Sequence, residues 1–156
     1  MVELLSESPH VELNKALRRA EQVMARHIRD RHLNDEAHAE FAGLLDQASH
    51  LPGADEWAAG IQGLRFTGML VYRRSADDVR DASAAALAAT PREDVSARLS
   101  TAGAAYAYAP NDTTLAECFE TEAKALAVVG DPAVRAELSA FVERVRANVR
   151  RLKEEI

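Results

Sequence analysis

The chain has 156 residues, of which 47% are hydrophobic and 28% charged, and its formal net charge is -6 at pH 7. This length favours one domain, and a chain of this size buries roughly 68–70% of its unfolded surface. The composition is typical of globular rather than disordered proteins. The negative charge disfavours nucleic acid or an anionic membrane as the main partner.

Cellular context is indicated by the N-terminus and by the cysteine content. The first ten residues, MVELLSESPH, carry acids where a secretory signal needs bases, and no apolar run approaches the length of a membrane span. The single cysteine, Cys118, excludes an intrachain disulfide and suits a reducing compartment. We therefore expect a cytoplasmic protein with no membrane partner, in which residues 1–8 form a flexible tail and residues 9–156 form one helical domain.

The first part of the chain predicts two helices. One covers about Pro9–Leu33, with Ser8 as its N-cap. The dipeptide Asn34-Asp35 predicts a break before a second helix that ends near His50, although one bent helix over both segments is the alternative. The apolar stripe of the first helix consists of Leu13, Leu17, Ala20, Met24 and Ile28.

The stretch Ala54–Arg74 holds the only tryptophan and is apolar on nearly every side when it is drawn as a helix. A helix that is apolar all round is either buried among other helices or covered by another chain. We therefore expect this helix to lie at the centre of the fold. One stripe holds Trp57, Ile61, Leu64, Gly68 and Val71, and the other faces hold Phe66, Met69 and Leu70.

Three glycines, Gly60, Gly63 and Gly68, fall within one sector of this central helix. Each costs up to about 1 kcal/mol relative to alanine in a helix interior. We expect a neighbouring helix to approach closely there as compensation. A strand over Phe66–Tyr72 is the alternative, but the sequence offers no second strand to pair with it.

Four more helices are predicted in the rest of the chain. Ser75 begins a segment that resembles a capping box. Thr90, Pro91 and Glu93 give the clearest helix-start signal in the chain, and a glycine and a proline separate the last two helices. The predicted ranges are about 75–89, 91–107, 113–129 and 132–156.

These elements together predict an all-α, single-domain bundle of about six to seven helices around Ala54–Arg74. The turns between the helices are short. No linker and no internal repeat is evident in the sequence.

Polar residues interrupt two of the apolar stripes. Glu122 lies in the middle of one stripe, and His27 and Arg31 lie on or beside another. A buried carboxylate must be paired, protonated or bound to a ligand. The favoured interpretation is a structural ion pair or hydrogen bond that fixes the helix register, for example between Glu122 and Arg31 or Arg65. The alternative is a polar pocket that binds a small ligand or a metal.

Histidines and acids gather around the predicted turn between the first two helices. The candidate metal ligands are His27, His32, His38 and Asp35, and imidazole and carboxylate groups suit zinc, iron or nickel. However, His27 and His32 are five residues apart, about 140° around a helix, so they do not share a face. Surface histidines are therefore the favoured interpretation, and no cofactor is expected.

No catalytic residue is assigned, because phosphate-binding glycine loops, zinc spacings and serine-nucleophile motifs are absent from the sequence. For Cys118 a buried structural role is favoured over a nucleophile.

We favour a non-enzymatic protein–protein interaction or assembly module, either a homodimer or a subunit or adaptor of a larger complex. A small metal- or ligand-binding protein and a nucleic-acid-associated subunit are the alternatives, and the net charge makes the last the least favoured. The candidate interaction surface comprises Phe66, Leu70, Arg18, Arg26 and Arg29.

Overall fold

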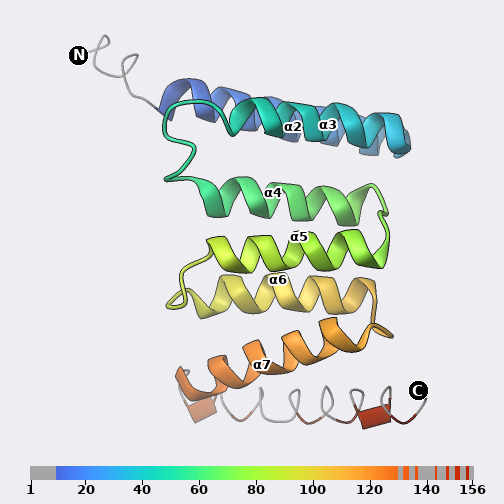
Figure 1. The fold of residues 1–156 in the computed structure, drawn as a ribbon, viewed down its shortest axis with the longest axis vertical. Coiled ribbons are helices and arrows are strands. Elements are labelled where there is room, and N and C mark those ends of the chain that lie inside the picture. Colours follow the sequence, from blue (N-terminus) through green and yellow to red (C-terminus); the bar gives the residue numbers. More distant parts are fainter. Residues whose placement is uncertain are drawn as a thin grey trace. The chain divides into compact units, whose positions relative to one another are not determined.

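The computed structural model describes residues 10–129 and eight single positions beyond them, namely 132, 133, 136, 143, 147, 150, 151 and 154. Six helices, α2 to α7, account for most of the described chain, and no strand occurs in it (Figure 1). The all-α prediction is therefore confirmed, and the strand alternative for residues 66–72 is wrong because these residues continue or end helix α4. None of the helices in the described ranges combines the length and hydropathy needed to cross a lipid bilayer.

The chain divides into two compact units, Met1–Ser75 and Ala76–Ile156. Each unit has its own set of packed helices and is described by itself. The predicted single domain over residues 9–156, and the central position of the apolar helix within it, stay predictions. The predicted tail, residues 1–8, lies outside the described residues, as does most of the predicted last helix.

The first unit contains three helices, α2 (His10–Arg29), α3 (Asp35–Ala48) and α4 (Ala58–Val71). Helices α2 and α3 run antiparallel, and α4 packs against both (Figure 1). Their facing apolar stripes meet in one core, with Phe41, Leu13 and Leu45 among its most deeply buried side chains. The buried members of this core are Leu13, Leu17, Ala20, Ala37, Phe41, Leu45, Ala48, Ala54, Ile61 and Tyr72.

Helix α2 differs from its prediction at its C-terminal end. It stops at Arg29, and Arg31 then adopts a left-handed conformation with φ of 55°. Val23 and His27 are buried there, whereas Ile28 is 48% exposed. The buried positions from residue 13 to 27 therefore repeat every 3.5 residues on average, the spacing that keeps one helix facing another along its length. The predicted stripe departs from this line at Met24, which is only partly buried, and ends on the exposed Ile28.

The break between α2 and α3 is confirmed by its hydrogen bonds. Oδ1 of Asn34 accepts a hydrogen bond of 2.8 Å from the backbone N–H of Ala37, so Asn34 is the N-cap of α3. The inward face of α3 contains Ala37 and Phe41, as expected. The alternative of one bent helix is therefore wrong.

Helix α4 begins later than predicted, because residues 54–57 form turns and Trp57 occupies the N-cap position. Trp57 is 40% exposed and its ring contacts the ring of His10, with 6.0 Å between the two centroids. The close approach expected at the glycines occurs at Gly68 only, where a Cβ would lie 2.5 Å from the Phe41 ring. At Gly63 a Cβ would meet nothing within 4 Å.

The second unit contains α5 (Ala76–Ala89), α6 (Val95–Tyr108) and α7 (Thr113–Val129). Successive helices run antiparallel and pack side by side (Figure 1). Small side chains bring α6 and α7 together, and the Phe119 ring fills the space beside Gly103 and Tyr106. The buried cluster of α6 and α7 comprises Ala102, Ala116, Phe119 and Ala123, with Leu99, Tyr106 and Cys118 packed against it.

The predicted start of α6 at residues 90–93 is wrong. Thr90 instead ends α5, since its backbone N–H donates to the carbonyls of Ala86 and Leu87 and its hydroxyl donates to Ala86. A turn follows, and α6 begins after Asp94, whose Oδ1 accepts from the N–H of Ala97 at 3.2 Å. The hydrogen bonds of Thr90 therefore pair with carbonyls at the end of α5 and not with N–H groups at the start of α6.

Candidate functional site

In the first unit, the buried His27 is bonded through both ring nitrogens. Its Nδ1 lies 2.8 Å from the hydroxyl oxygen of Tyr72, and its Nε2 lies 3.4 Å from Oε2 of Glu40. Arg26 donates to the other Glu40 oxygen at 3.0 Å. The tautomer with its proton on Nε2 accepts a hydrogen bond from the Tyr72 hydroxyl and directs its N–H toward Glu40. The chain Arg26–Glu40–His27–Tyr72 therefore links α2, α3 and the end of α4.

Tyr72 keeps its proton at neutral pH. Burial of its hydroxyl and the negative charge of Glu40 raise the pKa of Tyr72 to about 12, against a smaller opposing effect of Arg26. Its ring is surrounded by aromatic rings, including those of His38 and Phe41, with centroids 5.3 Å and 5.6 Å away. The Tyr72 side chain therefore donates a hydrogen bond and packs against neighbouring rings, and it does not act as a phenolate.

The predicted metal ligands do not form a ligand set. His32 is exposed and its Nε2 lies 3.4 Å from Nδ2 of Asn34. Asp35 accepts a hydrogen bond of 2.5 Å from Arg74. His38 lies with its ring edge-on to Tyr72. Among the residues that the structure describes, no group of three or more histidine, cysteine, aspartate or glutamate side chains has the arrangement needed to hold a metal ion.

In the second unit, Glu122 of α7 is buried and is bound by Arg98 of α6. Nε of Arg98 donates to Oε2 at 3.2 Å and Nη2 donates to Oε1 at 2.9 Å. Nη1 of Arg98 donates to the carbonyl oxygens of Leu87 at 2.7 Å and Thr90 at 3.0 Å. The predicted ion pair of Glu122 is thus present, but its partner is Arg98.

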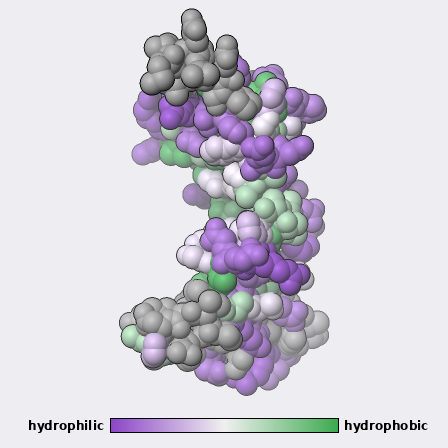
Figure 2. All heavy atoms as spheres, turned by 90° about the vertical axis from the view of Figure 1, so that its left-hand side faces the viewer, coloured by the Kyte–Doolittle hydropathy of each residue, from purple (hydrophilic) through white to green (hydrophobic). Residues whose placement is uncertain are grey.

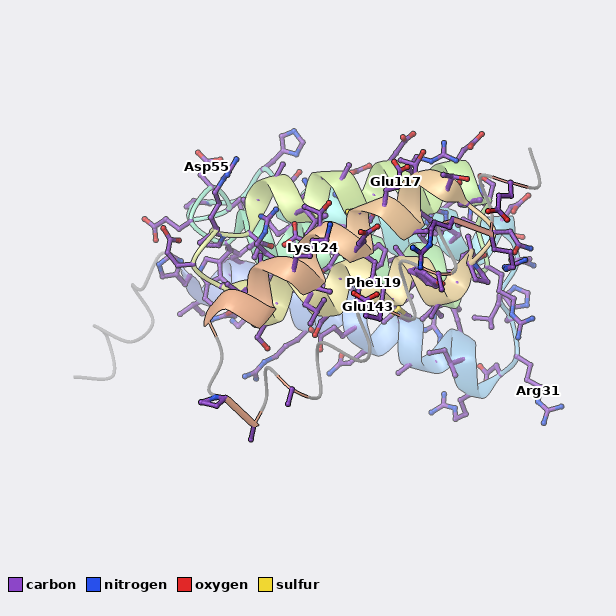
Figure 3. The ribbon with its side chains drawn as sticks, turned by 90° about the horizontal axis from the view of Figure 1, so that it is seen from below. Arg31, Asp55, Glu117, Phe119, Lys124 and Glu143 are labelled. Atoms are coloured by element: carbon purple, nitrogen blue, oxygen red, sulfur yellow. The ribbon has the colours of Figure 1, made fainter. Side chains whose placement is uncertain are left out.

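The two arginines expected at Glu122 have other surroundings. Arg65 is bound to Asp46 at 2.8 Å. Arg31 lies in the turn after α2, and its side chain extends away from the ribbon (Figure 3). The sequence does contain a signal for Arg98, since residues 98, 102 and 105 share one face of the predicted helix and the last two are alanines. Both alanines are buried in the structure.

A hollow of about 310 Å³ lies between α6 and α7 beside this ion pair. Charged side chains contribute much of its wall, including Arg92, which is exposed. Glu122 already neutralises Arg98, so Arg92 is the remaining charged group of the wall. Its lining residues are Arg92, Val95, Arg98, Thr121, Glu122 and Ala125.

Cys118 packs against the same helix pair. Burial raises the pKa of the Cys118 thiol, and the negative charge of Glu122 raises it further while Arg98 lowers it. The thiol is therefore protonated at neutral pH and is a poor nucleophile. This geometry agrees with a structural role.

Comparisons with protein families, with curated proteins and with solved structures find no match for this chain. The function must therefore be inferred from the site geometry and the surface.

The residues predicted for an interaction surface have different environments. Phe66 is only 5% exposed, and Leu70 is half-buried. Arg18, Arg26 and Arg29 are all exposed on α2. On the face shown in Figure 2, hydrophilic side chains predominate over α2 and α3. The exposed candidates for contact are therefore the basic residues of α2.

Proposed function

We propose that the chain is a non-enzymatic protein–protein interaction or assembly module, as a subunit or adaptor of a larger complex or as a homodimer. The observation that carries this proposal is the exposed basic face of α2. This helix has five basic and two acidic residues among Lys, Arg, Asp and Glu, although the whole chain has a net charge of -6. The five basic residues are Lys15, Arg18, Arg19, Arg26 and Arg29, and all are exposed.

The polar residues in the two cores support a structural rather than a chemical role. Both carboxylate oxygens of Glu122 and both ring nitrogens of His27 already have protein partners. Groups that are satisfied in this way fix how helices pack. These contacts favour a function that depends on the exterior of the helices.

Two large apolar side chains are exposed in the described part of the chain. Ile28 is 48% exposed near the end of α2, and Trp57 is 40% exposed at the start of α4. Tryptophan is enriched among the residues that contribute most to protein–protein binding. The single cysteine of the sequence favours a reducing compartment, so we place the complex in the cytoplasm.

Native mass spectrometry of the protein isolated at its natural abundance, with and without a chelator, tests the proposal. We expect a mass above that of the 17.0 kDa single chain, accounted for by protein and unchanged by the chelator. A single-chain mass under these conditions would contradict the proposal. Added mass that the chelator removes would favour the metal-binding alternative instead.

Binding of a small ligand is a second candidate, supported by the hollow beside Arg98 and Glu122. Its volume of about 310 Å³ falls at the lower end of the range for small-molecule sites. The same spectra test it, because a bound small molecule would add a few hundred daltons rather than a protein mass. Such a mass, lost on substitution of Arg92 by alanine, would favour this second function.

A further inference from the structure

A groove of about 230 Å³ runs between α2 and α3 in the first unit. Its apolar part is formed by Ala16, Leu44 and Leu51, which are partly buried and pack against the core below. Its rim carries charged and polar groups from both helices. These rim residues are Glu12, Lys15, Arg19 and Gln47.

The basic residues of α2 extend from this rim as one stripe. At 100° per residue, the five basic positions of the helix fall within a sector of about 100°. Arg19 lies at the edge of that sector next to the groove, and Arg18 lies at the other edge. An apolar depression and a positive stripe are therefore adjacent along the same helix.

Two of the five basic residues of the stripe are not neutralised by a carboxylate in the described ranges, whereas Arg26 pairs with Glu40 at 3.0 Å and Arg29 with Asp30 at 3.4 Å. Arg18 and Arg19 make no ion pair with any residue in the described ranges. Lys15 is 3.5 Å from Glu12, but both side chains are 71% exposed. Exposed pairs of this kind contribute little and exchange readily for other partners.

We infer that this groove and the adjoining stripe bind an acidic amphipathic helix of a partner protein. This inference rests on the proposed function and specifies its partner. Apolar side chains of the bound helix would pack on Leu44 and Leu51, and its carboxylates would pair with Lys15 and Arg19 at the rim. Helices commonly bind grooves between helices through side chains spaced by three or four residues.

Two observations favour a protein helix over a nucleic acid. The groove presents apolar surface between its charged rims, which suits leucine-like anchors and offers nothing to a phosphate. The chain also carries a net charge of -6, which repels a polyanion over distances beyond the stripe. The positive stripe attracts a short acidic peptide, whereas the net negative charge of the chain repels a long polyanion. Both effects favour a short acidic partner.

The test uses the full-length protein and a fluorescein-labelled synthetic peptide of about 15 residues. The peptide has leucine at helical i, i+3, i+4 and i+7 positions and glutamate on its other faces. A matched peptide has lysine in place of every glutamate, and a single-stranded oligonucleotide represents nucleic acid. Fluorescence anisotropy at about 50 mM salt, where surface charges are weakly screened, gives the dissociation constants.

Substitutions at the rim distinguish this site from general electrostatic attraction. Gln47→Glu is nearly isosteric and places a negative charge at the groove, so we expect affinity for the acidic peptide to fall about threefold, whereas Gln47→Lys should raise it. Lys15→Glu with Arg19→Glu should weaken binding about tenfold or more. The matched control is Lys124→Glu with Arg150→Glu, which changes the net charge equally on exposed residues of the other unit and should leave affinity within about twofold.

Several results would overturn the inference. Equal binding of the acidic and basic peptides, or no response to either Gln47 substitution, would show that the groove is not the site. Tighter binding of the oligonucleotide than of the acidic peptide would assign the stripe to nucleic acid. If the acidic peptide bound only after deletion of residues 1–8, the occupant would be this chain's own N-terminal segment. In each case a protein complex in the native spectra would still uphold the proposed function, so the two failures are distinguishable.

Discussion

Arg98 holds both carboxylate oxygens of Glu122 across the α6–α7 interface, with N–O distances of 3.2 Å and 2.9 Å. The same guanidinium donates to the carbonyls of Leu87 and Thr90 at the end of α5. A cation is favourable at this position, because the last carbonyls of a helix lack intrahelical donors and carry partial negative charge. One side chain thus connects all three described helices of the second unit.

Removing Arg98 should therefore destabilise the protein more than neutralising Glu122. Arg98→Met leaves a buried carboxylate and two carbonyls without their donor, and we expect it to lower the free energy of unfolding by about 3 kcal/mol. Glu122→Gln keeps an acceptor for the guanidinium and should cost about 1–2 kcal/mol. Urea titrations followed by circular dichroism measure both values. A loss below about 0.5 kcal/mol for Arg98→Met, the range of ordinary surface substitutions, would show that the pair is not structurally important.

The same substitution at two glycines should have opposite effects. Gly43→Ala in α3 meets nothing within 4 Å, so it should stabilise the protein by about 0.5–1 kcal/mol through helix propensity. Gly68→Ala places a Cβ 2.5 Å from the buried Phe41 ring, and we expect a loss of about 1–3 kcal/mol from overpacking. Thermal unfolding of the two variants is a direct comparison, and a stabilising Gly68→Ala would refute the described α3–α4 contact.

Tyr72 gives the first unit a defined sensitivity to alkaline pH. Its folded-state pKa of about 12 exceeds the ordinary tyrosine value of 10.0, so the folded state retains the proton more strongly than the unfolded state. The stabilisation that the protonated Tyr72 gives to the folded state is complete below pH 10 and is lost as pH rises towards 12. The free energy of unfolding should fall by an amount on the order of 2 kcal/mol over this range. Unfolding free energies of the wild type and Tyr72→Phe between pH 9 and 12 test this.

The expected signature is a smaller decline of stability with pH in Tyr72→Phe than in the wild type. At neutral pH the variant should lose about 1–3 kcal/mol, because Nδ1 of the buried His27 loses its hydrogen-bond partner. Absorbance at 295 nm in the native wild type should show one tyrosine that ionises near pH 12. Parallel pH curves for the two proteins would contradict the burial of this hydroxyl.

Cys118 should react slowly with thiol reagents. Burial and the charge of Glu122 raise the pKa of the thiol, so little thiolate is present at pH 8, and we expect alkylation by iodoacetamide to be at least about tenfold slower than that of an unfolded control. Mass spectrometry of timed samples measures the rate. Alkylation at the rate of the denatured protein would show that the thiol is exposed.

Local patterns in the sequence predicted the helices well, and distant pairings were not predictable. Asn34 caps α3 by accepting from the N–H of a residue three positions later, so a motif of four residues is enough to predict this helix start. Thr90 matches the sequence pattern of a helix N-cap equally well, yet its hydroxyl donates to the carbonyl of Ala86 in the preceding helix α5. The competing bond depends on the end of a preceding helix, which a capping motif does not describe.

The partners of the buried polar residues required knowledge of how helices face one another. Glu122 was predicted to be buried and paired, which its stripe position implies. Its partner is 24 residues away, and the partner of His27 at Tyr72 is 45 residues away. Each pairing is set by the register between helices, and a change of one residue in that register would bring a different side chain into contact.

The central claim is that this chain assembles with a partner through the basic face of α2. The most direct measurement is the elution volume of the protein in size-exclusion chromatography of cell extracts at natural abundance. We predict that the wild type and the Lys124→Glu, Arg150→Glu control elute in the same complex, while Lys15→Glu with Arg19→Glu elutes as a folded single chain. Elution of all three proteins at one volume, whether in a complex or as a monomer, would contradict the claim.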